Sequence, residues 1–199
     1  KALQSGTAHY FGNGFSKAFG IQFQGRDGKL ANPYQTSWGV STRLIGAIIM
    51  VHGDDNGLVL PPYVAPIQVV VIPVAANKPG VIPASRDIAK KLEETNLRIK
   101  LDESDKSAGW KFSEYEMKGV PIRVEVGPRD LANGVVTIAK RNDGTKTQIK
   151  IEEMNEYILK LVKVIHKEMY DKAYTYLLDH TSEAHSLDDI KDIVDNKGG

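Results

Sequence analysis

The stretch IQVVVIPV, residues 67–74, decides the fold of this chain. It is apolar almost without interruption, and most of its residues are β-branched. A continuous run of this kind is typical of a strand that is covered on both faces, as in a sheet flanked by helices. We therefore expect a buried strand here, with the neighbouring segments supplying the rest of an α/β domain.

Downstream of this strand, the periods of helices and strands alternate along the chain. The stretch PASRDIAKKLEET places Ile88, Ala89 and Leu92 at helical spacing, and NDGT at residues 142–145 is a hairpin signal. The expected elements are helix 83–95, strand 97–101, loop 102–109, helix 110–119, strand 121–126, strand 135–141, strand 148–151 and helix 152–178. They predict an α/β domain with a mostly parallel sheet and a mixed edge. The tail from residue 186 is either one more short helix or a frayed end.

Upstream of the strand, the three prolines of LPPYVAP, residues 60–66, disfavour both helix and interior strand. We place a domain boundary there. Residues 1–60 are predicted as strand, turn, strand and helix, with AFGIQFQ at 18–24 a half-buried strand and residues 25–34 a loop. The segment from Ser41 to Val51 is apolar on nearly every side, which is typical of a core helix.

Composition limits the classes of function. The 199 residues include 26 Lys and Arg against 25 Asp and Glu, so any polyanion has to be met by a local patch and not by the overall field. The chain has no cysteine, which excludes disulfides and cysteine-based zinc sites. Its longest apolar stretches fall short of the roughly 20 residues of a membrane span. We expect a soluble intracellular protein, and the start without methionine indicates a piece of a longer one.

One permanent charge, Arg43, stands directly before the apolar run of SWGVSTRLIGAIIM, residues 37–50. In the first turn of a helix beginning near Ser41 it would lie beside free main-chain N–H groups, which favour an anion. A guanidinium adds a planar set of donors for phosphate and can stack on a base. The alternative is an arginine that caps the rim of the domain or pairs with a carboxylate.

Polar side chains with small neighbours occur in QSGTAH, where Gln4, Thr7 and His9 offer an amide, a hydroxyl and an imidazole. If this segment is a strand, alternation places Thr7 and His9 on one face. The alternative is a turn with satisfied polar groups. The remaining histidines are not at metal-ligand spacing, and we predict no metal site in the chain.

Acidic and basic residues crowd the stretch EYEMKGVPIRVEVGPRDLANG, residues 114–134. Ligands of α/β sheets bind at the carboxyl ends of strands. Arginine reads the acceptors of guanine and carboxylates accept from its donors, so this mixture can read single-stranded bases. Gly127 and Pro128 would hold Arg129 and Asp130 on a rigid turn. The alternative is a solvated charged face.

Three stretches in order, ALQSGTAHYFG (2–12), the segment from YQTSWGVSTR to VVVIPV (34–74) and GWKFSEYEMKGVPIRVEVGPRDL (109–131), closely resemble prolyl-tRNA synthetases of the archaeal and eukaryotic-like type. The resemblance covers nearly the whole chain. It implies that residues 1–63 are the C-terminal part of a class II catalytic domain, ending its antiparallel sheet with the strand and helix of motif 3. Residues 64–180 then form a mixed five-stranded α/β anticodon-binding domain, and residues 181–199 a tail or the start of an extension.

The resemblance also implies roles for single residues. Arg43 would stack on the ATP adenine and touch the phosphates, with Gln4 and Thr7 also contacting the nucleotide. His9, Trp38, Gly39 and Ser41 would line the proline pocket. The implied reaction forms prolyl-adenylate from proline and ATP with Mg²⁺, and then transfers proline to tRNA(Pro). Glu116, Arg123, Arg129, Asp130 and, from the hairpin turn, Lys146 would read the two guanines shared by proline anticodons.

The chain also departs from the family pattern. Motif 1, with the dimer contacts, and motif 2, with a second ATP arginine, would precede Lys1, and the zinc-binding C-terminal extension is not matched. We therefore expect a cytoplasmic homodimer for the whole enzyme, no zinc in this chain and no adenylate formation by the chain alone. Two alternatives stay open: a catalytically inert tRNA-binding module or paralogue, and a threonyl- or glycyl-type synthetase, which SWGVSTR and GPRD disfavour.

Overall fold

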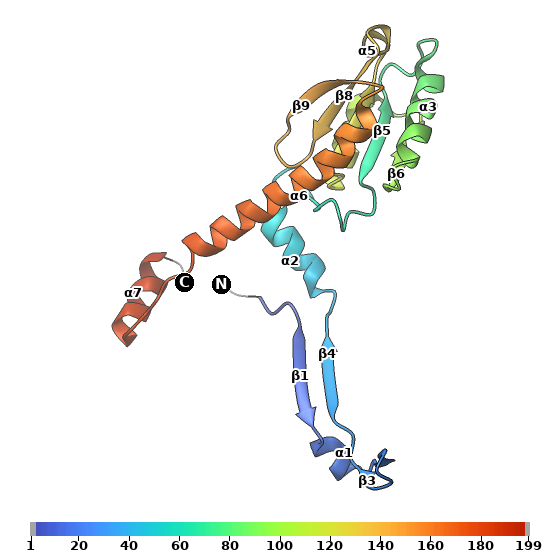
Figure 1. Cartoon of the computed structure of the whole chain (residues 1–199). Helices are drawn as coiled ribbons and strands as arrows, with labels where there is room; N and C mark the ends of the chain where they lie inside the picture. Colours follow the sequence, from blue (N-terminus) through green and yellow to red (C-terminus); the bar gives the residue numbers. More distant parts are fainter. Residues whose placement is uncertain (1–2, 198–199) are drawn as a thin grey trace. The chain divides into compact units, whose positions relative to one another are not determined.

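A computed structural model describes residues 3–197 of the chain (Figure 1). The chain divides into two compact units, residues 1–48 and residues 49–199. The first unit contains two two-stranded sheets, and the second contains one sheet of five strands. Among the described residues, no helix combines the length and the apolar character that a bilayer span requires.

The first unit is organised by a two-stranded antiparallel ladder. Strand β1 (Thr7–Gly12) pairs with β4 (Gln35–Gly39), with Thr7 opposite Gly39 and Ala8 opposite Trp38. Between them lie α1 (Gly14–Ala18) and the short strands β2 (Phe23–Gln24) and β3 (Leu30–Ala31). The ladder brings the QSGTAH and SWGVSTR stretches together.

The predicted strand at residues 18–24 is wrong over most of its length, because Ala18 ends helix α1 and only Phe23 and Gln24 are extended. Local hydrogen bonds decide this: Phe19 N donates to Phe15 O, and Ile21 N donates to Ser16 O. Gly20 adopts a φ of 66°, the left-handed conformation that closes a helix. Alternation of apolar residues alone did not reveal this turn.

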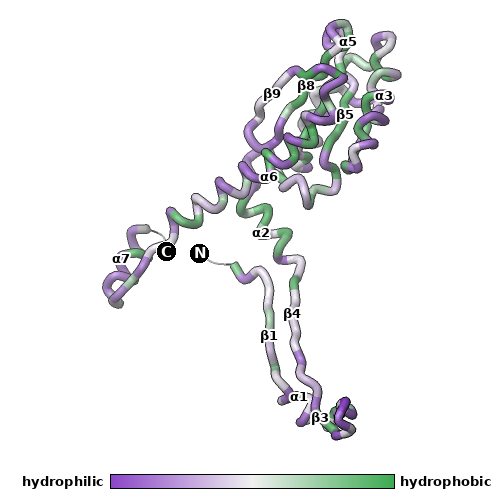
Figure 2. Tube along the Cα trace, in the orientation of Figure 1, coloured by the Kyte–Doolittle hydropathy of each residue, from purple (hydrophilic) through white to green (hydrophobic). Residues whose placement is uncertain are grey.

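Helix α2 (Arg43–His52) begins at the predicted arginine, but it is not a core helix within the described residues. None of its residues is buried, and Ile45 and Met50 are 62% and 70% exposed. Its apolar character is visible as a green segment in Figure 2. An apolar sequence predicts that a helix packs against another surface, but it does not identify that surface. The described residues do not bury α2.

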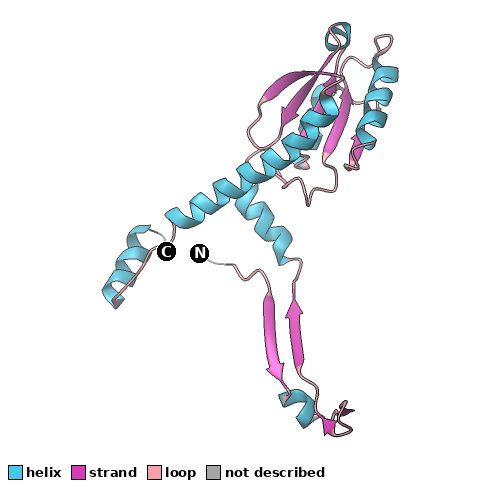
Figure 3. Cartoon of the chain, in the orientation of Figure 1, coloured by secondary structure: helices cyan, strands magenta, loops and turns pink. Residues whose placement is uncertain are grey.

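The second unit contains the predicted α/β fold, with helices (cyan) and strands (magenta) packed together in Figure 3. Its five-stranded sheet has the order β6-β5-β7-β8-β9. Strand β5 pairs in parallel with β6 and β7, whereas β7–β8 and β8–β9 pair antiparallel. The elements are β5 (Val69–Pro73), α3 (Val81–Glu93), β6 (Ile99–Leu101), α4 (Ala108–Met117), β7 (Ile122–Val126), α5 (Pro128–Ala132), β8 (Val135–Lys140), β9 (Lys146–Lys150), α6 (Met154–Asp179) and α7 (Leu187–Lys197). The mixed sheet is therefore confirmed, and the tail forms a helix.

Helices cover the two faces of this sheet unequally. One core cluster joins β5, β7 and β8 to α3 and α6, through residues such as Val69, Leu92 and Ile158. On the other face a smaller cluster joins Val70 and Ile72 of β5 to Tyr115 of α4. Strand β5 is buried along its whole length, as IQVVVIPV predicted. Helix α4 covers the second face mainly at β5, which leaves the β8–β9 side of that face open.

Residues just before the proline-rich stretch pack on the second unit. Leu58 N donates to Met117 O at 3.0 Å, and Leu60 N donates to Gly119 O at 3.3 Å. Gln68 Nε2 donates to Pro62 O at 3.0 Å. This compact unit thus begins ahead of the prolines, while a functional division at residues 63/64, with a tail from residue 181, stays a prediction.

Candidate functional site

One face of the sheet carries polar and charged side chains over three adjacent strands. On β7, Ile122 and Val124 point into the larger core, so Arg123 and Glu125 lie on the opposite face. Across the ladders, Arg123 is level with Ala139 of β8, which is level with Lys146 of β9. We call this surface the open face; it consists of Arg123, Glu125, Thr137, Ala139, Lys146 and Gln148.

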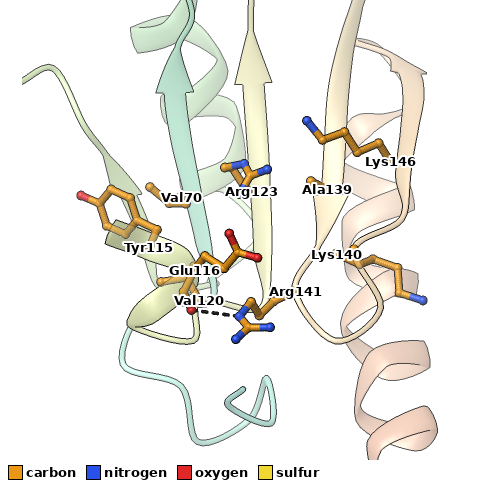
Figure 4. A pocket seen from close by; sticks show the side chains of 10 residues that line it. Val70, Tyr115, Glu116, Val120, Arg123, Ala139, Lys140, Arg141 and Lys146 are labelled. Carbon is orange, nitrogen blue, oxygen red and sulfur yellow. Dashed lines mark hydrogen bonds between the residues drawn. The ribbon is translucent and has the colours of Figure 1, made fainter. Parts of the chain in front are cut away.

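A pocket of about 230 Å³ lies where the open face meets helix α4. Figure 4 shows Glu116 of α4 on one side of it and Arg123, Ala139 and Lys146 across the strands. Its lining residues are Val70, Tyr115, Glu116, Val120, Arg123, Ala139, Lys140, Arg141, Gly144 and Lys146. Three of the five predicted anticodon residues, Glu116, Arg123 and Lys146, therefore line one pocket.

Arg123 is held on two sides. Its guanidinium carbon lies 4.2 Å from the ring centroid of Phe112, a cation–π contact from α4. Its Nε donates to Glu125 Oε1 at 3.0 Å. Lys146 Nζ lies 2.8 Å from the same carboxylate oxygen.

The predicted placement of Lys146 in the hairpin turn was wrong. Lys146 is the first residue of β9, because the turn is closed one residue earlier, where Lys140 N donates to Thr145 O.

The GPRD stretch forms the short helix α5, with Gly127 at its N-cap and Pro128 at its first position. Asp130 turns toward the open face, where Thr137 Oγ1 and Gln148 Nε2 donate to its two carboxylate oxygens at 3.0 and 3.2 Å. Arg129 is exposed, and the described residues give it no ion pair. The stretch expected to be a rigid turn is therefore a helix, which joins Asp130 to the open face and leaves Arg129 exposed.

Arg141 was missed by the sequence reasoning. Its Nε donates to the main-chain oxygen of Glu116 at 2.9 Å, as drawn in Figure 4, and its two terminal nitrogens donate to Asp54. These bonds hold the pKa of Asp54 well below its usual range, at about 2. Burial and the neighbouring Asp102 raise the pKa of Tyr115 to about 12, so this phenol of the pocket wall is neutral at physiological pH. No local sequence motif predicts the role of Arg141, because its partner Asp54 lies 87 positions earlier in the chain.

The first unit contains a second pocket, of about 250 Å³. Arg43 Nη1 donates to Gln4 Oε1 at 3.3 Å, and Arg43 N donates to Ser41 Oγ at 3.3 Å. Gln4, Ser5, Gly6, Thr7, Gly39, Val40, Ser41 and Arg43 line it. The three residues predicted for ATP therefore lie together, with Gly39 and Ser41 of the predicted proline set.

His9 and Trp38 do not join that pocket. His9 is level with Ser37 and Trp38 with Ala8, so the two side chains lie on opposite faces of the β1–β4 ladder. His9 stacks on Phe11 with ring centroids 5.4 Å apart, and Trp38 is 79% exposed. The ladder confirms the expected common face of Thr7 and His9 but does not bring His9 and Trp38 into one wall.

Within residues 3–197, no group of three or more histidine or acidic side chains could hold a metal ion. Among the residues that the structure describes, no carboxylate lines the pocket around Arg43. A magnesium ion accompanying ATP would therefore have to be held by groups other than those that line this pocket.

Comparisons with known proteins agree with this architecture. Residues 68–161 match the family model described as an anticodon binding domain. All 199 residues align with proline–tRNA ligases of Lachnospira eligens, Clostridium novyi and Lachnoclostridium phytofermentans, at 50%, 50% and 48% identity. The alignments cover 42%, 41% and 41% of those proteins, so the chain spans about two fifths of their length.

Proposed function

Because this chain carries an anticodon-binding domain and is similar over its whole length to the C-terminal part of proline–tRNA ligases, we propose that it serves an enzyme that joins proline to tRNA(Pro) in the cytoplasm. The second unit reads the anticodon, and the first supplies motif 3 of the catalytic site. The whole enzyme acts as a homodimer, in which the proline carboxylate attacks the α-phosphate of ATP to give prolyl-adenylate and release pyrophosphate.

The observation that carries this proposal is the grouping of Glu116, Arg123 and Lys146 around one pocket. Guanine presents O6 and N7 acceptors and N1–H and N2–H donors. The two cations suit its acceptors and the carboxylate of Glu116 suits its donors. Asp130 offers a second acceptor at the carboxyl end of β7, where α/β sheets bind ligands. Arg129, which is exposed on α5, is the remaining anticodon residue of the proposal.

In the first unit, Arg43, Gln4 and Thr7 are the proposed nucleotide contacts. The pocket at the start of helix α2 supports this role, since free N–H groups and a guanidinium both favour phosphate. Gly39 and Ser41 lie in the same pocket and are proposed for proline. These residues are proposed to bind and orient the reactants, because the reaction involves no covalent intermediate on the protein. A tRNA-binding module without catalysis would have no use for this pocket.

The proposal is tested by binding of the purified chain to tRNA(Pro) transcripts at constant salt. Each anticodon guanine is replaced by adenine, singly and together, and each replacement is expected to cost about 1–3 kcal/mol. Arg123→Ala should remove much of this discrimination. Arg86→Ala is the matched control, because Arg86 is an exposed arginine of α3 paired with Glu103. Equal affinity for all transcripts would overturn the proposal.

A further inference from the structure

Glu125 holds two of the proposed base-reading cations with one oxygen atom. Arg123 Nε and Nη2 each lie 3.0 Å from Glu125 Oε1, and Lys146 Nζ lies 2.8 Å from it. The residue as a whole is 8% exposed. A buried carboxylate needs such partners, and here both partners come from the open face itself.

The strand register explains why these three groups meet. Arg123 and Glu125 are two residues apart on β7 and so share a face. Lys146 lies two strands away, in the row of Arg123, with Ala139 of β8 between them. The small side chain of Ala139 leaves the space in which the lysine reaches back toward β7. Figure 4 shows Arg123 and Lys146 on either side of Ala139.

Without the carboxylate, the two cations would repel each other on a partly buried surface. The side chain of Arg123 is 16% exposed and that of Lys146 is 49% exposed, so solvent screens the pair only in part. Phe112 supports Arg123 from α4 at 4.2 Å but does not fix its rotation. Glu125 uses two of the five N–H groups of the guanidinium and one proton of the ammonium, which leaves donors on both for a ligand.

We propose that Glu125 is a positioning residue, which holds Arg123 and Lys146 together as one unit for the O6 acceptor of a guanine and does not itself contact the base. This inference rests on the proposed anticodon-reading function. It assigns a specificity role to a carboxylate that would otherwise only add negative charge beside a polyanionic RNA.

The test uses the whole chain, its Glu125→Gln variant and synthetic RNA stem-loops with the proline anticodon, at constant salt. In separate stem-loops one guanine is replaced by 2-aminopurine, which lacks O6 and N1–H, or by inosine, which lacks only the 2-amino group. In the parent chain we expect the 2-aminopurine substitution to weaken binding about 10-fold. In Glu125→Gln we expect that penalty to fall to about 3-fold, the part that comes from the missing N1–H donor to Glu116. We also expect weaker binding of the unmodified stem-loop and an unchanged inosine penalty.

If Glu125 acted only through long-range charge, Glu125→Gln should bind the unmodified stem-loop more tightly, because removing an acidic group reduces repulsion of the RNA phosphates. Glu152→Gln, at an exposed acid of the second unit, is the matched control for this effect and should keep the full 2-aminopurine penalty. If Glu125→Gln does not fold, as judged by thermal unfolding, Glu125→Asp keeps the charge on a shorter side chain. It should lose part of the same penalty.

The outcomes separate the inference from the function on which it rests. If the parent chain shows neither penalty, the anticodon-reading function fails. If the parent shows both and Glu125→Gln keeps the full 2-aminopurine penalty, only the positioning role fails. A loss of the inosine penalty together with the 2-aminopurine penalty would mean that Glu125 contacts the base directly, and this too would overturn the inference.

Discussion

Arg141 and Asp54 form a two-pronged ion pair, with Nη1 to Oδ2 at 2.7 Å and Nη2 to Oδ1 at 2.6 Å. The third donor of the same guanidinium, Nε, binds the main-chain oxygen of Glu116 at the end of α4. One arginine on the β8–β9 side of the pocket therefore ties the loop after α2 to the helix that carries Glu116. Its side chain is only 6% exposed, so its charge depends on these partners.

Asp54→Asn should destabilise the second unit by about 1–2 kcal/mol, because it leaves a nearly buried guanidinium without its counter-charge. The expected loss of stability is small because the Asp54 side chain is 45% exposed, so that solvent partly screens the ion pair. Urea unfolding of the chain measures it. Asp55→Asn, at the next exposed acid, should change stability by less than about 0.5 kcal/mol.

The same pair predicts a pH dependence. The folded-state pKa of Asp54, about 2, lies below the ordinary 3.8 that applies to the unfolded chain. The contribution of the Asp54–Arg141 pair to the free energy of unfolding is therefore complete above the pKa of Asp54 in the unfolded chain. It is lost as the pH falls toward the pKa of Asp54 in the folded chain. Between about pH 5 and about pH 2 the parent chain should lose more stability than Asp54→Asn. Parallel acid titrations of the two would contradict the assignment.

Gly119 permits the close approach of the loop around Leu58 to the end of α4. Gly119 has a φ of 69°, and a Cβ there would lie 2.7 Å from Leu58 Cβ and from Leu58 O. Gly119→Ala combines left-handed backbone strain with this overlap and should cost more than about 2 kcal/mol. Gly134→Ala has a similar φ of 67° with open space around it, so it should cost only about 1 kcal/mol. Equal losses in thermal unfolding would mean that the contact with Leu58 is unimportant.

Pattern reasoning predicted the elements of the second unit well, because its strands and helices have clear periods and turn residues. The run at residues 67–74 identified the buried strand β5. The GPRD stretch was expected to form a rigid turn, but it begins the short helix α5. The assignment of Glu116, Arg123 and Lys146 to one site came from family resemblance, and the structure places them around one pocket.

The remaining features depend on contacts that no local pattern records. The bond between Arg141 and Asp54 joins residues far apart in sequence, and the role of Glu125 depends on the register of three strands. Hydropathy identified α2 as apolar but overestimated its burial, since burial also needs a surface to pack against. The strand predicted at residues 18–24 failed because Gly20 ends a helical turn within it.

Lys111 is a buried ammonium that fixes α4 to the end of β6. It is 1% exposed, and its Nζ donates to Asp102 O at 2.9 Å and lies 3.6 Å from the Asp102 carboxylate. Lys111→Ala should destabilise the unit by about 3 kcal/mol, as expected when one partner of a buried pair is removed. Lys111→Met fills the space and should cost less. Lys163→Met, on the exposed side of α6, should be within about 0.5 kcal/mol of the parent in urea unfolding.

The carboxylate of Asp130 lies at the open face, and neither of the two side chains that donate hydrogen bonds to it carries a charge. Thr137 and Gln148, which bind its two oxygens, are neutral donors. Asp130→Asn should change the free energy of unfolding by less than about 1 kcal/mol, since one acceptor and the side-chain shape remain.

Its effect on RNA binding should be larger. If Asp130 accepts from the N1–H and N2–H groups of a guanine, Asp130→Asn should weaken binding of the proline stem-loop by about 1–3 kcal/mol and reduce the penalty of an inosine at that position. Asp105→Asn removes the same charge from an exposed loop and should leave binding unchanged or slightly stronger. Stronger binding by both variants would mean that Asp130 only repels the phosphates, and would remove it from the set of residues that read the anticodon.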